Sequence, residues 1–532
     1  MTRRRFNFLA VLGISLGSCH ALAAPGDVPT PAPEPTVVSS GSTGESATHS
    51  PDLTEAKGMV MLDYQLIPVP GNPSIDLMGF HFLNRMNDGL HMGFGGYAPL
   101  FEGEYGGFMI LDVTAHAQHR ISGKLFANAG VSLGGGGGGK SMLQSKELSG
   151  TGGFAKAYVG LGYDFDGFSA GANIARTKLS NSAIDHSQVN VFVQIPFSYA
   201  IGPYVSAGDS FLSSAEAGSR EAGAESSESM LSLGLDNFRQ IDPQGSNKGT
   251  INLADLQFSH FLTNNAYSYF NVGIGYRGLP LHNQVIGGLG YRLKLTPDLN
   301  LYGQLGLGSG GYAPDTIDTG AGLLVYPKLS AEYMASRNLG LALSAGYMSA
   351  PSGSSKNYTY GAVLNYHLHG GTGGSGASAV IDGIYSGYRF HLFQQTELNV
   401  KFNNVDRNNI KMLSVQGDKI VSDNFYIPVQ VSVAYNDHLG LPGYGEFLAG
   451  VGVQNKYDKG DRVQVFGQLL VGTNVHGPIL KTGIGLNVGL SDGLAIYGQA
   501  GQTHAGTGSN SGKFRSDYAG IGLTYRFSMP SR

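Results

Sequence analysis

The sequence is short of the residues that most soluble proteins and helical membrane proteins need. Charged residues make up only 14% of its 532 positions, whereas soluble globular proteins carry about 25%. Beyond the N-terminus it has no run of about 18 unbroken apolar residues that could form a membrane-spanning helix. Tryptophan is absent, so any aromatic belt at a membrane surface must use tyrosine and phenylalanine. These shortages argue against a soluble protein and against a bundle of transmembrane helices.

Other absences limit the kinds of site and partner that the sequence gives reason to expect. Cys19 is the single cysteine, which excludes an intramolecular disulfide framework. The net charge of −4 gives no reason to expect a nucleic-acid partner. The stretch 134–141 matches the pattern of a phosphate-binding loop. However, the strand expected before it alternates apolar and polar residues and no βαβ unit surrounds it, so we expect a flexible loop. No motif implies a cofactor or a resident metal.

The first 23 residues have the features of an export signal. Arg3-Arg4-Arg5 precedes an apolar run, and Ala21-Leu22-Ala23 offers a cleavage site. Alternatively, the residues around Cys19 resemble a lipidation motif, which would leave a lipidated Cys19 as the first residue. The arginines also resemble a twin-arginine signal, which normally carries folded cargo. Residues 24–57 are rich in proline and serine and are expected to form a disordered periplasmic arm.

Glycine (82), tyrosine (28) and phenylalanine (26) are abundant, and apolar residues alternate with polar or small ones along most of the chain. The segment 518–527 is the clearest case. Its alternate positions form one apolar face, opposite a small and polar face that includes Arg526. A period of two with one apolar face is what a β-strand between lipid and water requires. The apolar positions are Ala519, Ile521, Leu523, Tyr525 and Phe527.

This last strand resembles the C-terminal insertion signal of bacterial outer-membrane β-barrels, with Leu523, Tyr525 and Phe527 as its apolar positions. The resemblance is to such barrels in general, porins included, and covers roughly residues 58–527. It departs from the pattern in one respect, because residues 528–532 follow Phe527. The resemblance implies an antiparallel transmembrane barrel in the outer membrane of a Gram-negative bacterium, with the lipid bilayer and the barrel assembly machinery as partners.

The chain also contains an internal repeat. Residues 301–305 echo 465–469 and, more loosely, 125–129. We expect three copies of an eight-strand unit, at 58–206, 250–369 and 379–527. A polar connecting insert at 207–249 and a glycine-rich joint at 370–378 separate the copies. The copies could merge into one barrel of about 24 strands, which we expect, or close as three separate eight-stranded barrels.

Seven polar residues lie on the predicted inner face of the strands. In a wide barrel they line a pore, and in a narrow one they form a packed, hydrogen-bonded interior. They are Asn190, Gln194, Gln304, Asn365, His367, Gln468 and Arg526.

Architecture therefore decides the expected function. A wide barrel would let small polar solutes pass, or would export a polymer. The alternative is a non-transporting structural or adhesive surface protein. We do not expect an enzyme, because the His-x-Ser pattern that outer-membrane phospholipases and lipid A deacylases carry is missing.

Overall fold

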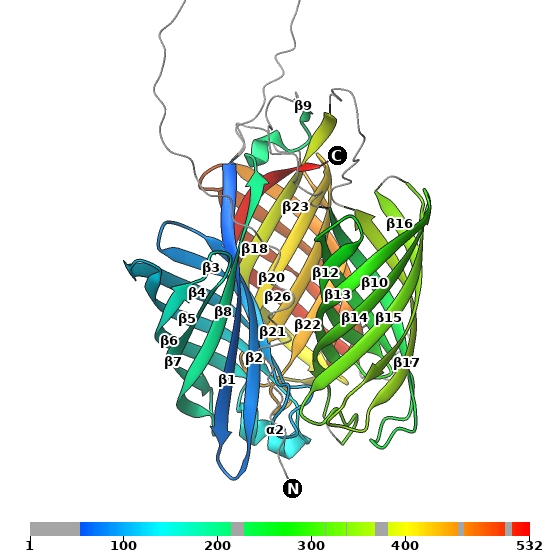
Figure 1. Cartoon of the computed structure of the whole chain (residues 1–532). Coiled ribbons are helices and arrows are strands. Elements are labelled where there is room, and N and C mark those ends of the chain that lie inside the picture. The colour runs from blue at the N-terminus through cyan, green and yellow to red at the C-terminus, as the bar shows by residue number, and fades with distance from the viewer. Residues whose placement is uncertain are drawn as a thin grey trace, which may run out of the picture.

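The computed structural model describes residues 54–213, 228–313, 315–336, 338–367, 381–455, 462–505 and 513–531. Within them the chain is almost entirely antiparallel β-structure, folded into three closed barrels that lie side by side (Figure 1). No helix in the described part is long and apolar enough to cross a membrane.

The first barrel closes because β8 pairs with β1. Its strands are β1 (Thr54–Val69), β2 (Asn72–Arg85), β3 (Leu90–Ala98), β4 (Met109–Ser122), β5 (Leu125–Gly137), β6 (Gly153–Asp164), β7 (Ser169–Leu179) and β8 (Asp185–Ile201). The helix α2 (Met142–Ser149) lies in the connection between β5 and β6. The predicted flexible loop at 134–141 thus begins inside β5 and ends just before this helix.

The second barrel closes through the pair β10–β17. Its strands are β10 (Ser229–Gln240), β11 (Ile251–Phe261), β12 (Ala266–Arg277), β13 (Asn283–Thr296), β14 (Leu299–Gly311), β15 (Leu323–Met334), β16 (Leu339–Ser349) and β17 (Lys356–His367).

The third barrel closes through the pair β18–β26. Its ring comprises β18 (Ile381–Phe402), β20 (Ile410–Ser422), β21 (Phe425–Ala434), β22 (Gly445–Gln454), β23 (Val463–Asn474), β24 (Gly477–Gly489), β25 (Leu494–Ala505) and β26 (Phe514–Ser531). Two short strands pair with β18 outside the ring, namely β9 (Ser210–Ser213) and β19 (Val405–Asp406).

The pairing corrects the expectation of a single wall of about 24 strands. Each set of eight strands closes on itself, which is the alternative that the sequence left open. One wide barrel and three small barrels are equally compatible with the alternation of apolar and polar residues along a strand, because that alternation depends only on which face of the strand meets lipid and which faces the interior. The ion-paired side chains described below fill each ring separately, and they would be far apart in one wide barrel.

Several expected boundaries differ from the strand limits. Residues 54–57, expected in the arm, begin β1, and β26 continues to Ser531. The expected insert 207–249 contains β9 and β10. Along β10, Leu233 and Leu235 face outward and alternate with buried residues. Because the residues before β10 are rich in serine and glutamate, the sequence-based boundary wrongly extended the polar insert across this strand. The export signal, Cys19, most of the arm and the joint 370–378 lie outside the described residues.

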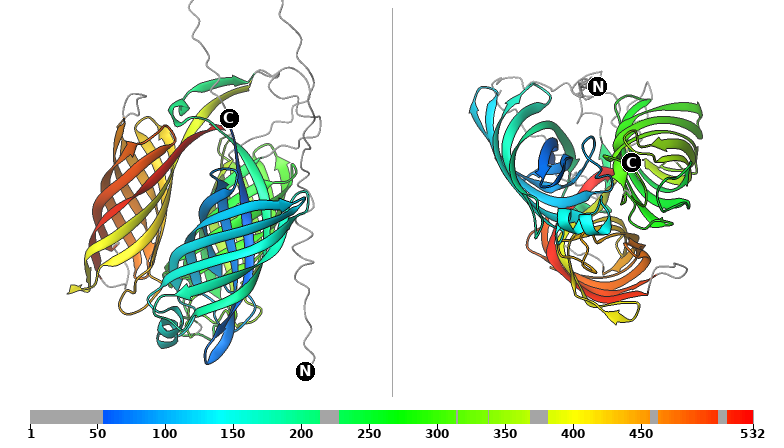
Figure 2. Two further views of the ribbon diagram at one scale, coloured as in Figure 1. Left: turned by 90° about the vertical axis from the view of Figure 1, so that its left-hand side faces the viewer. Right: turned by 90° about the horizontal axis from the view of Figure 1, so that it is seen from below.

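The three barrels contact one another through their walls. Phe80 of β2 stacks on Phe270 of β12 with ring centroids 4.4 Å apart, and Phe94 of β3 stacks on Phe390 of β18 at 5.2 Å. Lys419 of β20 places its Nζ 3.5 Å from the ring centroid of Tyr366 on β17. Each barrel therefore touches the other two, in the triangular arrangement seen from below in Figure 2.

Loops at one end join the first two barrels further. The backbone N–H of Gly106 donates to Gly320 O (2.9 Å), and that of Leu323 donates to Leu100 O (3.1 Å). Ser309 Oγ donates to Pro99 O at 2.5 Å. This end carries α2 and lies opposite the strand ends where the chain enters and leaves each barrel (Figure 1).

At the opposite end, the segment after β8 crosses to the third barrel. Gly202 pairs with Ser528 of β26, and the short 3-10 helix η1 (Tyr204–Ser206) follows. The backbone N–H of Tyr204 donates to Asp492 Oδ2 at 3.2 Å, and β9 then pairs with the start of β18. The chain therefore visits the third barrel before it builds the second (Figure 1).

Candidate functional site in the barrel interiors

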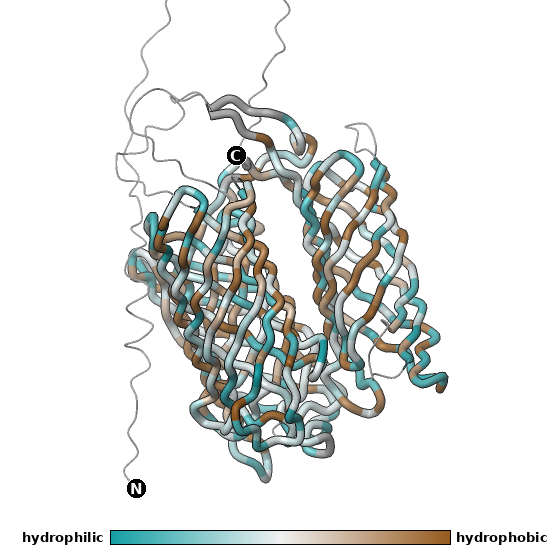
Figure 3. Tube along the Cα trace, turned by 90° about the vertical axis from the view of Figure 1, so that its right-hand side faces the viewer, coloured by the Kyte–Doolittle hydropathy of each residue, from teal (hydrophilic) through white to brown (hydrophobic). Residues whose placement is uncertain are grey.

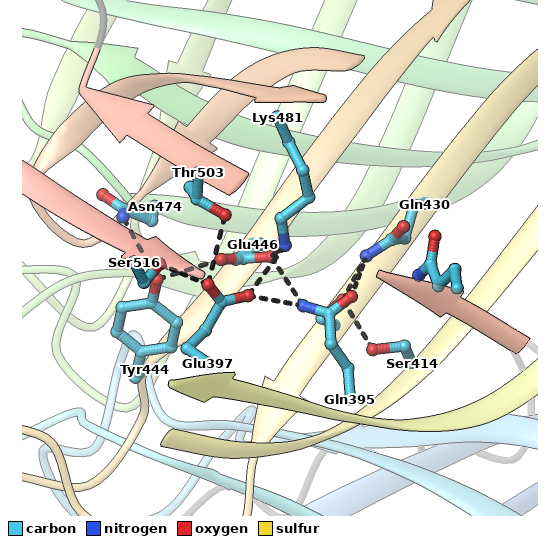
Figure 4. A network of polar contacts seen from close by, with 12 residues as sticks. Gln395, Glu397, Ser414, Gln430, Tyr444, Glu446, Asn474, Lys481, Thr503 and Ser516 are labelled. Carbon is cyan, nitrogen blue, oxygen red and sulfur yellow. Dashed lines mark hydrogen bonds and ion pairs between the residues drawn. The ribbon is translucent and has the colours of Figure 1, made fainter. Parts of the chain in front are cut away.

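The interior of the third barrel is bridged by a lysine held between two glutamates (Figure 4). Lys481 Nζ on β24 lies 2.9 Å from Glu397 Oε1 on β18 and 2.5 Å from Glu446 Oε2 on β22. All three side chains are completely buried. Thr503 and Ser516 donate to Glu397, and Tyr444 donates to Glu446. Strands from around the ring thus meet at one ionic cluster that fills the lumen.

A second cluster fills the same barrel nearer the end opposite α2 (Figure 1). Arg389 donates through Nε to Asp418 Oδ2 at 2.9 Å, and His391 Nε2 lies 2.9 Å from the same oxygen. Its Nη1 donates to both Gln454 Oε1 at 2.7 Å and Gln464 Oε1 at 2.8 Å, and its Nη2 lies 2.7 Å from Asp418 Oδ2. Arg389 is 2% exposed, so a buried cation is fully matched by acceptors here.

The second barrel repeats this arrangement. Lys328 Nζ on β15 lies 2.6 Å from Asp236 Oδ2 on β10. Nearer the end opposite α2, His367 bridges two carboxylates, with Nδ1 2.9 Å from Glu228 Oε1 and Nε2 3.0 Å from Glu332 Oε1. Arg292 clamps Glu228 with two hydrogen bonds of 2.6 and 2.8 Å, a bidentate geometry that makes strong pairs.

The first barrel contains the third version. Lys156 of β6 forms a short ion pair with Asp63 of β1, and its Nζ also donates to Tyr97 OH at 3.0 Å. His81 lies between Asp63 and Asp112, with Nε2 3.2 Å from Asp112. Every member of this cluster is at most 3% exposed.

The three lysines occupy equivalent places. Each stands on the sixth strand of its ring and pairs with an acid on the first strand. The pairs are Lys156 with Asp63, Lys328 with Asp236, and Lys481 with Glu397. This correspondence gives structural evidence for three copies of one unit.

The seven residues predicted on the inner face all point into the barrels. In the first barrel, Gln194 hydrogen-bonds His116 at 3.1 Å, whereas Asn190 is fully buried without a side-chain hydrogen bond in the described structure. In the third, Gln468 donates to Gln499 at 2.9 Å, and Arg526 donates to Ser491 O at 2.6 Å.

The remaining three lie in the second barrel. Asn365 donates to Glu332 at 2.7 Å, His367 joins the carboxylates described above, and Gln304 lines a small cavity. All seven belong to packed interiors spread over three rings, so they do not meet at one site.

Little open space remains inside. A cavity of about 30 Å³ in the second barrel, about the volume of one water molecule, is lined by Gln304, Asp255 and Asn271 among others. A cavity of about 50 Å³ lies beside α2, next to Tyr105 and Lys140. Neither space approaches a passage for a solute.

Sequence reasoning missed the three lysines and all of their partner acids. Lys156, Lys328 and Lys481 recur at similar spacings within alternating segments, and that recurrence was a usable signal. Charged residues at inward positions of a strand are expensive to bury alone. Their presence in each copy therefore indicates partners within the same copy and a filled interior.

The outer face is apolar. Along β26 the predicted insertion strand keeps its alternation, with Ile521 66%, Leu523 51% and Tyr525 42% exposed, while Thr524 and Arg526 are buried. Phe527 stacks on Tyr388 at 5.8 Å. Leu343 on β16 and Ile484 on β24 are each 72% exposed. Hydrophobic positions alternate with more hydrophilic ones along the strands (Figure 3), and the exposed hydrophobic side chains give the apolar outer wall that a lipid-facing surface requires.

No family model matches the chain, and no curated protein matches it. Solved structures that match include the ferric enterobactin receptor of Pseudomonas aeruginosa, at 10% identity over 89% of this chain and 81% of that one, with a TM-score of 0.27. The siderophore receptor PirA from Acinetobacter baumannii matches at 10% identity over 89% and 80%, with a TM-score of 0.26. The NanC porin matches at 9% identity over 55% and 98%, with a TM-score of 0.16.

These neighbours are outer-membrane β-barrel proteins, the class that the sequence resembles, and they point to no narrower family. At these TM-scores they carry no argument about function. The all-β antiparallel barrel fold is confirmed by the strand pairing of the chain itself.

Proposed function

We propose that this chain is an outer-membrane protein whose three filled barrels form one rigid, non-conducting anchor that holds a joint loop surface at the cell exterior. Single eight-stranded barrels have interiors just wide enough for side chains to fill. The observation that carries the proposal is the buried lysine–carboxylate cluster across each lumen. This arrangement favours the structural or adhesive class over a wide pore.

The loops support the same proposal. Hydrogen bonds between the first and second barrels at the α2 end hold their loops in one fixed arrangement. Short turns normally face the periplasm and longer connections face outward. Within each barrel, the longest connection between consecutive strands lies at the α2 end, such as 138–152 between β5 and β6. It would therefore be the displayed surface.

Planar-bilayer conductance of the refolded mature protein tests the proposal, with folding checked by heat-modifiable gel migration. We expect no stable channels of nanosiemens order. A triple variant, Glu397→Ser, Glu446→Ser and Lys481→Ser, removes the ionic cluster of the third barrel and should raise conductance. Wide, stable channels from the unaltered protein would refute the proposal.

A second candidate is passage of water through the second barrel alone. Its cavity is lined by polar groups, and Ser232 Oγ, Asp255 Oδ2 and Asn271 Oδ1 have no hydrogen-bond partner in the described structure. Buried polar atoms beside such a space favour water. Osmotic shrinkage of proteoliposomes in sucrose that is faster than that of protein-free vesicles, and is slowed by Gln304→Phe, would support this candidate. Shrinkage no faster than that of protein-free vesicles would exclude it.

A further inference from the structure

The end of the third barrel that carries the longer loops has an excess of exposed cations. Lys401 and Arg515 face each other on β18 and β26, and His504 of β25 is the register partner of Arg515. Strands in a sheet lie about 4.8 Å apart, so three basic side chains share one row on the outer wall. Three further exposed cations, Arg407, Lys411 and Lys513, lie on the same rim.

These charges are only partly neutralised by the protein. Lys401 forms an ion pair of 3.5 Å with Asp406, which is itself 86% exposed. Within the described residues, the Arg515 guanidinium has no ion pair. Its neighbour Asp517 instead accepts hydrogen bonds from Asn399 (2.9 Å) and Gln502 (3.0 Å). Like charges directly opposite each other destabilise a sheet, so the row is unfavourable without a counter-ion.

The first barrel provides the contrast. At the same end, Arg176 and Lys178 of β7 are also exposed on the outer wall. However, both lie against Asp185 of β8, at 2.9 and 3.2 Å. Both cations of that cluster are held in direct ion pairs with one carboxylate, whereas in the row on the third barrel only Lys401 has a direct ion pair among the described residues and Arg515 has none.

The position of the row fits a lipid headgroup. Phe527 and Arg515 on β26 are 527 − 515 = 12 residues apart, about 40 Å along the strand. At the usual tilt of about 40° this is about 30 Å along the membrane normal, whereas the apolar band of such barrels is about 25 Å tall. With Phe527 at the inner edge of the band, Arg515 lies just beyond its outer edge, above Ile521 and Leu523.

We propose that Lys401, Arg515 and His504 form a binding site for the phosphate groups of an outer-leaflet glycolipid. The inference rests on the proposed outer-membrane placement and adds a ligand class to it. Clustered cations at the membrane surface recognise phosphate through charge-assisted hydrogen bonds, and Arg does so with a bidentate fork. The shared chemistry is a phosphate group, whether esterified on a lipid or free in solution as inorganic phosphate.

Native mass spectrometry of the full mature protein in detergent tests the site. Its probes are bis-phosphorylated lipid A, the same lipid without phosphates, and inorganic phosphate. Loss of about tenfold in affinity per cation predicts that the double variant K401S/R515S binds phosphorylated lipid A about 100-fold more weakly. The matched control R176S/K178S also removes two cations, but from the cluster that is ion-paired to Asp185, and should bind as the unaltered protein does.

Three results would overturn the site: equal binding of the dephosphorylated lipid, an equal loss in the control variant, or full competition by millimolar inorganic phosphate. Heat-modifiable migration of each variant shows that it is folded. Because the measurement is made in detergent and involves no conductance, its failure leaves the proposed anchoring role standing. If the protein conducts but still binds phosphorylated lipid A, only the proposed anchoring role is refuted.

Discussion

Replacing Lys481 with methionine should destabilise the third barrel strongly. The change removes the ammonium group that lies 2.9 Å from Glu397 and 2.5 Å from Glu446, at a site with no solvent exposure. Methionine has a similar volume, so the loss is mainly electrostatic. Removing one partner of a buried ion pair costs about 3–5 kcal/mol. The unfolding equilibrium constant of this barrel should therefore rise by about two to three and a half orders of magnitude.

The assay can be made specific to one barrel because the chain has no tryptophan. Ile521→Trp places a fluorophore on the lipid-facing wall of the third barrel, where Ile521 is 66% exposed. Urea unfolding from vesicles, followed by this signal, gives the free energy of unfolding with and without Lys481→Met. Leu343→Trp, on the outer wall of the second barrel, is the matched reporter and should register little change.

Stability should recover when the two unpaired glutamates are neutralised as well. Adding Glu397→Gln and Glu446→Gln to Lys481→Met removes the uncompensated charges, and neutral replacements of a buried ionic cluster are often tolerated. Stability should return to within about 2 kcal/mol of the starting protein. A loss below about 1 kcal/mol for the single variant would refute the argument, as would a triple variant no more stable than the single one.

Three further predictions concern the contacts between barrels and the loops. Phe80→Ala should cost about 0.5–1.5 kcal/mol beyond lost burial, measured by urea unfolding of the first barrel with a tryptophan on its outer wall. In the folded protein, burial lowers the pKa of His438 and His476 from 6.5 to about 4. As the pH falls, these histidines are therefore protonated in the unfolded chain before they are protonated in the folded one. Stability of the third barrel should fall as pH drops from 6.5 towards 4, and His476→Gln should flatten that slope. Gly107 has φ +91° and an added Cβ would lie 2.2 Å from Tyr312 O, so Gly107→Ala should loosen the junction and speed loop proteolysis.

The sequence allowed the strands to be predicted because alternation is a local property. The faces of β26 follow directly from Ile521, Leu523 and Tyr525 on one side and Thr524 and Arg526 on the other. Closure could not be predicted in the same way. Whether β8 pairs with β1 or with the next copy depends on contacts more than a hundred residues apart. The side chains that distinguish the two, Asp63 and Lys156 among them, look like ordinary polar positions when each strand is taken alone.

The inner-face residues illustrate the same limit. Gln468 and Asn365 were placed on the polar face by periodicity alone, and they do point inward. Their hydrogen bonds to Gln499 and Glu332 depend on the diameter of the ring. Periodicity carries no information about diameter, so it could not separate a pore lining from a packed interior.

The wall contacts have a consequence for how such an assembly can diversify. In a trimer of identical barrels, one mutation changes all three interfaces and all three loop sets at once. Here the contacts Phe80–Phe270 and Phe94–Phe390 are formed by different residues of one chain. Each interface, and each loop above it, can change while the other two stay fixed. The single polypeptide thus occupies the membrane area of a trimer, but its three barrels can carry three different loop surfaces. Each surface is present once, and their arrangement is fixed by the chain.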